Sequence, residues 1–498
     1  MPNRSSTAIL KAIKEKNSAY WEQVRKRRAL DLFHRAAKEV PAYKDFLKKA
    51  RIQPNKIKNF ADFQKVLPVN KDNYLRSYPL EKLCLPNTLS TESLVLTSTS
   101  GSTGTPFYFP RNGKLDIQSS IYHQFFLENT HLDKSKPTLV LICFGMGVWI
   151  GGVITYEAFK TISERGMPLT ILTPGVNKRE IFEAMKNIAP KYGQVILCGY
   201  PPFMKDVIDE GKTHGVDWHK FDLRIIFAAE AFSEKFRDYI LRKTGIKNPY
   251  RDTMNIYGSA DLGTMAEETP LSILVRRLAL KRPRLYRKIF REANRLPTLA
   301  QFHPDFINFE CVGKNIYCTG DNVLPLVRYE IGDNGGVMDF HQVEQIFSEE
   351  GMDLRDEAKK INIEDTISEL PFVYVYERSD FSTKLFGAIV FPEYIKAGLT
   401  DSKLEKYITG KFTMFTKHDR KQDEYLEVNI ELKFNHTATK KLSKDVSLAI
   451  VESLLERSTE YKYLVGLLGD RVRPHVIFWP HEHPTHFQTG IKQKWVKK

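Results

Sequence analysis

Hydrophobic and polar positions follow two different patterns along the chain. Residues 1–60 are rich in Lys and Glu and place Leu10, Ile13, Tyr20 and Val24 at helical spacing, which predicts a helical lead-in. From about residue 90 to 340, apolar runs such as TLVLICF, QVILCGY and LRIIFAAE alternate with helical stretches such as KREIFEAMKNIA and EKFRDYILRKTG. This alternation predicts a layered α/β domain after the lead-in.

A second β-rich block begins at PFVYVYERSD. A polar, acid-rich stretch separates this block from a predicted turn at Gly335-Gly336. We place the domain boundary near residue 378, which gives a large N-terminal domain over 1–377 and a small C-terminal domain over 378–498. The absence of a fixed-period repeat or a low-complexity tract argues against solenoid and fibrous architectures.

Length and composition agree with a multidomain globular protein. The chain has 498 residues, of which 42% are hydrophobic and 27% are charged. One uncharged stretch, Thr138–Tyr156, is nearly long enough to cross a bilayer, but its four glycines favour a buried strand, a glycine-rich bend and a helix start. We therefore predict no transmembrane span. Five scattered cysteines and no apolar leader in the first twenty residues predict a cytoplasmic protein.

The net charge of +15 favours anionic partners but does not choose among them. No RNA- or DNA-binding module accompanies it, so we predict no nucleic-acid partner. Nine of the basic residues lie between Leu274 and Arg295, inside a segment (about 271–305) that we interpret as a basic insertion. This segment is either a solvated helix or a docking surface for an acidic carrier protein, CoA phosphates or an anionic membrane.

The sharpest local feature is the run LVLTSTSGSTGTPFYF over residues 94–109. Nine consecutive positions, 97–105, are Ser, Thr or Gly, and two strand-like runs flank them. Glycines let backbone N–H groups converge and hydroxyls add donors, so such a loop can wrap phosphates, although it lacks the P-loop pattern. The composition alone is more typical of a flexible surface hairpin.

The order of further motifs resembles the adenylate-forming superfamily of acyl-CoA synthetases and related ligases. After TSGSTGTP come IIFAAEAFSEKFRDYI, MNIYGSADLG, PLVRYEIGD, YERSDFSTKLFGAIVFPEYI and TGIKQKWV. The segments EVPAYKDFL, LPVNKDNYLRSYPL and FGMGVWIGG are similar to the phenylacetate-CoA ligase branch. The resemblance implies an α/β fold, with a layered adenylating domain followed by a small, mobile α+β domain.

The resemblance also assigns roles to individual residues. It implies a nucleotide site in which a loop covers the ATP phosphates, a segment edges the adenine, an aromatic platform lies beneath the base, a carboxylate holds the ribose and an arginine lies near ribose and phosphate. The residues that match the phosphate loop are Ser100, Gly101, Ser102, Thr103 and Gly104. Glu230 and Ala231 match the adenine edge, and Tyr257 and Gly258 match the aromatic platform. Asp333 matches the ribose carboxylate, and Arg378 matches the arginine. Asp380 falls at the interdomain hinge. Lys492 matches the catalytic lysine that bridges the acid and the α-phosphate, and Lys494 competes with it for that role.

The nucleotide motifs depart from the family pattern at two positions. Thr105 stands where many members have Lys, and Ala260 stands where the pattern has a hydroxyl residue, with Ser259 one position away. Asp261 replaces the Glu that helps to hold Mg²⁺, and it can still serve as a catalytic oxygen ligand of that metal. These departures leave open a protein that binds nucleotide but has lost catalysis.

The acid substrate is predicted to lie against the FGMGVWIGG bend. Its residues Phe144, Met146, Trp149 and Gly151 are apolar or small, which favours an aryl or alkyl carboxylic acid. The expected activity is an ATP- and Mg²⁺-dependent activation of the acid to an acyl-adenylate, with CoA as the expected acceptor. An amine, alcohol or protein acceptor is the alternative. His481, His483 and His486 are a weaker candidate for a structural metal.

Overall fold

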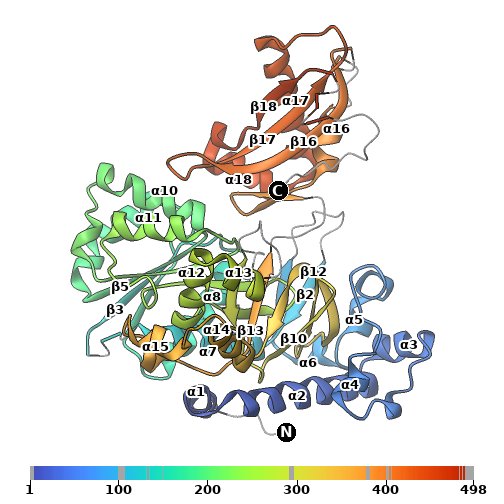
Figure 1. Cartoon of the computed structure of the whole chain (residues 1–498), viewed down its shortest axis with the longest axis vertical. Coiled ribbons are helices and arrows are strands. Elements are labelled where there is room, and N and C mark those ends of the chain that lie inside the picture. The colour runs from blue at the N-terminus through green and yellow to red at the C-terminus, as the bar shows by residue number, and fades with distance from the viewer. Residues whose placement is uncertain are drawn as a thin grey trace. The chain divides into compact units, whose positions relative to one another are not determined.

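The protein divides into two compact units, shown in Figure 1. The larger unit comprises Met1–Thr97 and Tyr108–Glu377, and the smaller comprises Ser98–Phe107 and Arg378–Lys498. The computed structural model describes residues 5–98, 107–130, 132–133, 135–147, 150–290, 297–376, 382–399, 403–404, 406–481, 483–484 and 486–487.

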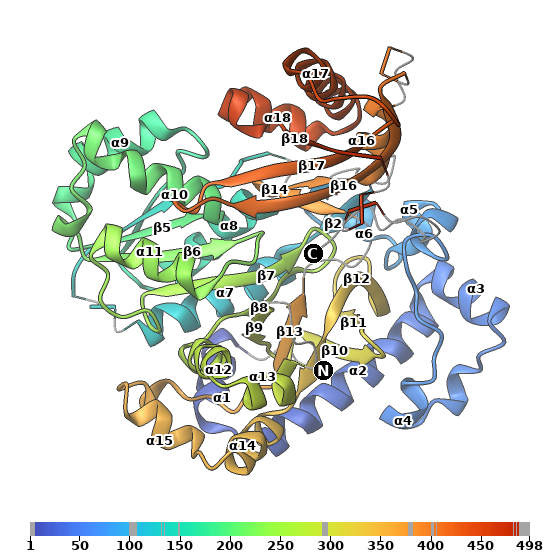
Figure 2. The same cartoon turned by 45° about the horizontal axis from the view of Figure 1, so that its top comes forward.

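An eleven-stranded sheet forms the centre of the larger unit, within the residues described (Figure 2). Its strand order is β10-β11-β12-β13-β9-β8-β7-β6-β5-β3-β4. The strands are β3 Thr138–Ile142, β4 Leu169–Leu172, β5 Gln194–Gly199, β6 Leu223–Ala228, β7 Thr253–Ser259, β8 Gly263–Glu267, β9 Thr298–Gln301, β10 Ile307–Val312, β11 Asn315–Gly320, β12 Leu326–Met338 and β13 Phe372–Tyr376. Strands β4, β3, β5, β6 and β7 pair in parallel, whereas the pairs from β7–β8 to the β10 edge are antiparallel.

Helices cover both faces of the parallel half. They are α7 Gly113–Asn129, α8 Ile150–Glu164, α9 Lys178–Asn187, α10 Pro201–Glu210 and α11 Glu234–Thr244. On β3, Leu139 and Leu141 pack in one core cluster with residues of α9, α10 and α11, while Val140 and Ile142 pack in another with residues of α7 and α8. Successive side chains of a strand point to opposite faces, so a strand covered on both faces is a continuous apolar run. The predicted α/β architecture is confirmed.

The uncharged stretch 138–156 is a strand and a helix start, as its glycines predicted. Strand β3 ends at Ile142 and α8 begins at Ile150. Gly147, between them, has a φ of +120°, a conformation that side chains with a Cβ rarely adopt. In the described part of the chain, no helix is both long and apolar enough to cross a membrane.

Helices α12 Pro270–Lys281, α13 Pro283–Phe290, α14 Phe340–Glu349 and α15 Leu354–Lys359 pack on the antiparallel half. The predicted turn at Gly335-Gly336 is wrong, because both glycines lie inside β12 and pair with β13. A Cβ on Gly335 would lie 1.9 Å from the carbonyl oxygen of Tyr374, and one on Gly336 would lie 2.4 Å from the tyrosine ring. These glycines permit the close approach of two strands.

The N-terminal lead-in is helical, as predicted. It contains α1 Ser6–Glu15, α2 Ser18–Glu39 and α3 Pro41–Lys49, followed by the short helices α4 Phe60–Phe63, α5 Leu80–Leu83 and α6 Thr88–Thr91. Leu10, Ile13 and Val24 are buried, while Tyr20 is only half-buried and Trp21 is buried beside it. Strands β1 Val95–Ser98 and β2 Tyr108–Arg111 then form a two-stranded sheet that flanks residues 99–107.

The smaller unit is α+β, as the resemblance implied. Strands β16 Ile408–His418, β17 Glu424–Leu432 and β18 His475–Trp479 form one sheet, and β14 Thr383–Leu385 pairs with β15 Ala388–Val390. The helices are α16 Pro392–Leu399, α17 Lys440–Arg457 and α18 Thr459–Leu468. Val428 and Ile430 of β17 and Val446 and Ile450 of α17 are fully buried in this unit.

Candidate nucleotide-binding site

Tyr257 and Asp333, which the motifs assigned to the base and the ribose, are in direct contact. The Tyr257 hydroxyl donates a hydrogen bond to Oδ2 of Asp333 at 2.6 Å, and both residues are half-buried. The Tyr257 ring also stacks on Phe309 of β10, with 6.1 Å between ring centroids and 28° between planes. The structure thus brings an aromatic face and a carboxylate from two distant motifs to one place.

The segment assigned to the adenine edge lies beside Tyr257. Glu230 and Ala231 follow the end of β6 after one residue, Ala229, and Ala228 of β6 pairs with Ile256 of the parallel strand β7. The carbonyl of Glu230 accepts a hydrogen bond of 3.0 Å from the side chain of Asn255. Ligands of open α/β sheets bind at the carboxyl ends of parallel strands, and this segment occupies such an end.

Gly258 is required by the tight β7–β8 connection. A Cβ at this position would lie 2.8 Å from the carbonyl oxygen of Gly263 on the returning strand. Any larger residue would therefore push the two strands apart and move Tyr257, the adjacent residue.

Asp261, the predicted metal ligand, lies between β7 and β8 and is only 4% exposed. Its Oδ2 accepts a hydrogen bond of 2.7 Å from the hydroxyl of Tyr329, a buried residue of β12. Mg²⁺ takes one or two protein carboxylates together with phosphate oxygens, so this carboxylate fits an ion that ATP brings with it.

The residues around Ala260 show how the missing hydroxyl is accommodated. Ser259 does not replace it, because its Oγ accepts from the backbone N–H of Leu262 at 3.2 Å and lies 3.7 Å from Sδ of Met265. The carbonyl of Ala260 accepts a 3.2 Å hydrogen bond from the hydroxyl of Thr97 on β1. Position 260 therefore has no side-chain hydroxyl, and Ser259 does not supply one in its place.

Asp261 and Asp333 also share an electrostatic environment. Burial raises the pKa of the Cys318 thiol on β11, and the nearby Asp333 and Asp261 carboxylates raise it further. This cysteine is therefore a neutral, buried side chain close to both residues.

The predicted wall of the acid pocket is described only in part. Phe144 is buried in the core with Phe159 of α8, and a Cβ on Gly151 would lie 3.7 Å from its ring. Met146 has 43% of its surface exposed. Trp149 lies outside the described residues, so the apolar character of the pocket stays a prediction.

Several other predicted site residues also lie outside the described part of the chain. They are Ser100, Gly101, Ser102, Thr103, Gly104, Arg378, Asp380 and Lys492, together with the variant position Thr105 and the competitor Lys494.

Two of the three C-terminal histidines pack against the ring of Trp479, whereas His481 contacts Phe434. His486 stacks on Trp479 with 3.9 Å between ring centroids, and His483 lies 4.6 Å from the same ring. Within the described residues, no group of three or more His, Cys, Asp or Glu side chains could hold a metal ion.

Part of the basic segment is built into the core. Arg276 is 1% exposed and pairs with Glu268 at 2.9 Å, while Arg277 pairs with Glu234 at 2.7 Å. The expectation of a fully solvated basic helix is wrong for these residues, because α12 and α13 bury their apolar side on the sheet and carry the two arginines inward. Lys281, Arg282, Arg284 and Arg287 are exposed, so a docking role for them stays a prediction.

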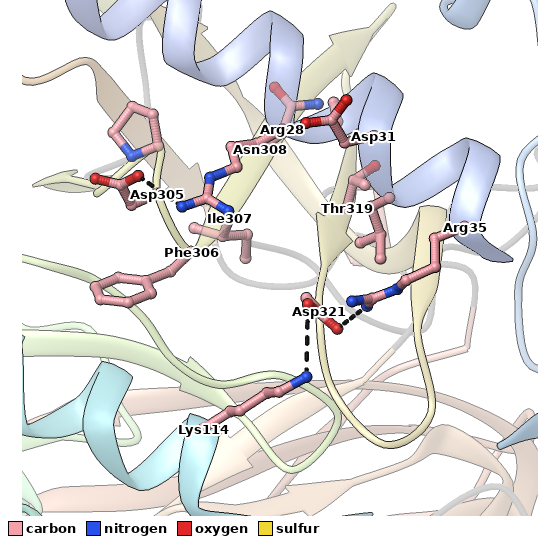
Figure 3. Close-up of a pocket in the computed structure, with 13 residues that line it drawn as sticks. Arg28, Asp31, Arg35, Lys114, Asp305, Phe306, Ile307, Asn308, Thr319 and Asp321 are labelled. Atoms are coloured by element: carbon pink, nitrogen blue, oxygen red, sulfur yellow. Dashed lines mark hydrogen bonds and ion pairs between the residues drawn. The ribbon is translucent and has the colours of Figure 1, made fainter. Parts of the chain in front are cut away.

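A cavity of about 570 Å³ lies between α2 and the strands β10 and β11 (Figure 3). Its cationic side chains are matched by acids: Arg28 pairs with Asp305 at 3.1 Å, and Asp321 pairs with both Arg35 and Lys114. These ion pairs connect the helical lead-in to the sheet and to α7.

Three residues of the candidate site were not predicted from the sequence. Phe309 supports the Tyr257 ring, Asn255 holds the Glu230 carbonyl and Tyr329 holds Asp261. Asn255 and Tyr329 lie within the quoted motifs MNIYGSADLG and PLVRYEIGD, so proximity along the chain was an available signal. Phe309 had none, since an apolar residue of a strand is usually core.

The large mixed sheet and the small α+β unit together form an architecture that also occurs in solved structures. The chain superposes on 2-hydroxyisobutyryl-CoA ligase in complex with 2-HIB-AMP and CoA in the thioesterification state, with a TM-score of 0.63, 15% identity and coverage of 98% of this chain and 91% of that chain. The same ligase in the postadenylation state with 2-HIB-AMP gives a TM-score of 0.54, with the same identity and coverage. No family model and no curated protein matches the chain. The fold that the motifs implied is confirmed, and at this identity the likeness shows the fold alone.

Proposed function

We propose that this protein is an ATP-dependent ligase that activates a carboxylic acid as an acyl-adenylate and then transfers the acyl group to a thiol, that of CoA. The observation that carries the proposal is the 2.6 Å hydrogen bond between Tyr257 and Asp333, which joins two motifs beside the carboxyl ends of the parallel strands β6 and β7. The shared fold with a CoA ligase whose complexes contain an acyl-adenylate and CoA supports it.

In the first half-reaction, a carboxylate oxygen of the acid attacks the α-phosphorus of ATP, and the bond to the bridging oxygen breaks to release pyrophosphate. Tyr257 supplies a face for the adenine, and Asp333 accepts hydrogen bonds from the ribose hydroxyls. Asp261 would hold Mg²⁺, and the ion would supply positive charge to neutralise the phosphates. Lys492 and the loop Ser100–Gly104 carry the remaining charge contacts as proposed from the motifs.

In the second half-reaction, the sulfur of CoA attacks the acyl carbon, AMP leaves, and the thiol proton passes to solvent. We assign Arg378 to the ribose and phosphate and Asp380 to a hinge between the domains 1–377 and 378–498. Phe144, Met146, Trp149 and Gly151 would favour an aryl or alkyl acid, as in the phenylacetate-CoA ligase branch. The free cysteines are consistent with the cytoplasm.

Acid-dependent exchange of labelled pyrophosphate into ATP, run over a library of carboxylic acids, tests the proposal. Exchange with one class of acid, followed by thioester formation only when CoA is present, is the expected result. Adenylation without thioester formation, but with acyl transfer to an amine or alcohol, would replace CoA as the acceptor.

A second candidate function follows from Ala260, whose missing hydroxyl Ser259 does not replace. A protein weakened at this position would bind ATP without catalysis. ATP binding without exchange for any acid in the library would favour this candidate over the ligase.

A further inference from the structure

The segment that we assign to the adenine edge is held at two of its carbonyls by different elements. It turns sharply after β6, because Ala229 has a φ of +76°, in the left-handed region that favours glycine. The Glu230 carbonyl accepts from Asn255 of β7, and the Phe232 carbonyl accepts from the guanidinium of Arg276 on α12. A strained turn persists only where its surroundings determine it.

Arg276 is fixed by a closed cluster of buried charges. Its Nη1 donates to Glu268 at 2.9 Å and lies 3.5 Å from Glu234. Arg237 bridges the same two carboxylates, at 2.6 Å to Glu268 and 3.0 Å to Glu234. Burial raises the pKa of Glu234, but Arg237, Arg276 and Arg277 outweigh this effect and lower that pKa overall. The Glu234 carboxylate is therefore charged around neutral pH.

The same cluster reaches the other anchored carbonyl. The backbone N–H of Glu268 donates to the carbonyl of Asn255 at 2.8 Å, and it is the Asn255 side chain that holds Glu230. The Arg237 guanidinium also lies over the ring of Phe232, 4.9 Å from its centroid. One connected network therefore fixes the segment on both sides.

We propose that Arg276 is a positioning residue which, by holding the Phe232 carbonyl, fixes the backbone at the base edge and so sets the preference for adenine over guanine. The inference rests on the proposed nucleotide function. Adenine presents an amino donor where guanine presents a carbonyl acceptor, so a rigid backbone edge that suits one base rejects the other. A segment freed from its anchor can turn its groups to suit either base.

The test compares the dissociation constants of ATP and GTP, measured by calorimetry, for the wild-type protein, Arg276→Lys and Arg277→Gln. Arg276→Lys keeps a cation for Glu268 but loses the fork that reaches Phe232 and the carboxylate together. Arg277→Gln is the matched control, because Arg277 lies on the same helix and pairs with Glu234 but makes no contact with the Phe232 carbonyl.

We expect Arg276→Lys to reduce the preference for ATP over GTP by about tenfold, the equivalent of one well-placed hydrogen bond, and Arg277→Gln to leave it within about twofold. A folded Arg276→Lys protein with an unchanged ratio, or with both constants raised equally, would overturn the inference. If Arg276→Lys does not fold, Asn255→Ser removes the other anchor without altering the charge cluster. It should reduce the ratio as well, and an unchanged ratio again counts against the inference.

Failure of the proposed function gives a different result. A wild-type protein that binds neither nucleotide refutes the nucleotide function itself. A wild-type protein that prefers ATP, combined with variants that keep the preference, refutes only the role of Arg276.

Discussion

The contact between Tyr257 and Asp333 leads to a prediction about how their contributions to ATP binding combine. Asp333→Ala removes the carboxylate that we propose accepts hydrogen bonds from two ribose hydroxyls. A hydrogen bond to a charged group contributes about 1.5–3 kcal/mol. Asp333 is half-buried, so we take the lower figure for each bond, which gives about 3 kcal/mol and a roughly 150-fold rise in the dissociation constant of ATP.

Tyr257→Phe keeps the aromatic face and removes only the hydroxyl that orients the Asp333 carboxylate at 2.6 Å. Loss of one such hydrogen bond costs about 1 kcal/mol, or roughly a fivefold rise in the dissociation constant. Because the hydroxyl acts through Asp333, we expect the double variant to bind ATP no more weakly than Asp333→Ala alone. The coupling energy of the cycle is then about 1 kcal/mol.

Calorimetric titration with ATP on the three variants measures these differences, with thermal unfolding as the control for folding. Both side chains are only half-buried and neither is in the core, so the melting temperatures should change little. Unchanged ATP affinity in a folded Asp333→Ala protein would refute the ribose assignment. Additive losses in the double variant would show that Tyr257 does not act through the carboxylate.

Three further predictions concern other parts of the chain. Lys492→Ala should raise the activation free energy of pyrophosphate exchange by about 3 kcal/mol, whereas Lys494→Ala should have little effect. A larger loss from Lys494→Ala would show that the motif register is wrong. Gly335→Ala should lower the free energy of unfolding in urea by about 1–3 kcal/mol, because its Cβ would lie 1.9 Å from a carbonyl oxygen of β13. Gly113→Ala is the control and should be nearly neutral, because its Cβ would have no atom within 4 Å. Equal stabilities of the two variants would contradict the close approach of the strands. Burial lowers the pKa of His123 to about 4, so below pH 6.5 only the unfolded chain gains its proton, and stability is lost as the pH falls towards 4. In urea titrations across this range, His123→Gln should lose about 1.4 kcal/mol less per pH unit than the wild type, and parallel curves would contradict the assignment.

The sequence predicted an element correctly where the pattern within one segment is enough to define it. The run TLVLI of β3 is apolar throughout because both of its faces are covered, and that pattern predicts a buried strand without knowledge of its neighbours. The order of the motifs likewise predicted the fold. The phosphate loop and Lys492 stay predictions, because they lie outside the described residues.

Pairings between distant segments were decided only by the tertiary structure. A Gly-Gly pair favours a turn on its own, yet Gly335 and Gly336 lie inside β12, because β13 approaches too closely for side chains. An arginine-rich helix predicts a solvated surface, yet Arg276 is buried. It donates hydrogen bonds to Glu268 and to the Phe232 carbonyl, which lie outside its own helix. Residue type and periodicity report whether a segment is apolar and how it repeats. They do not report which charge or carbonyl will lie opposite a side chain, since that partner is set by how the strands are ordered in the sheet.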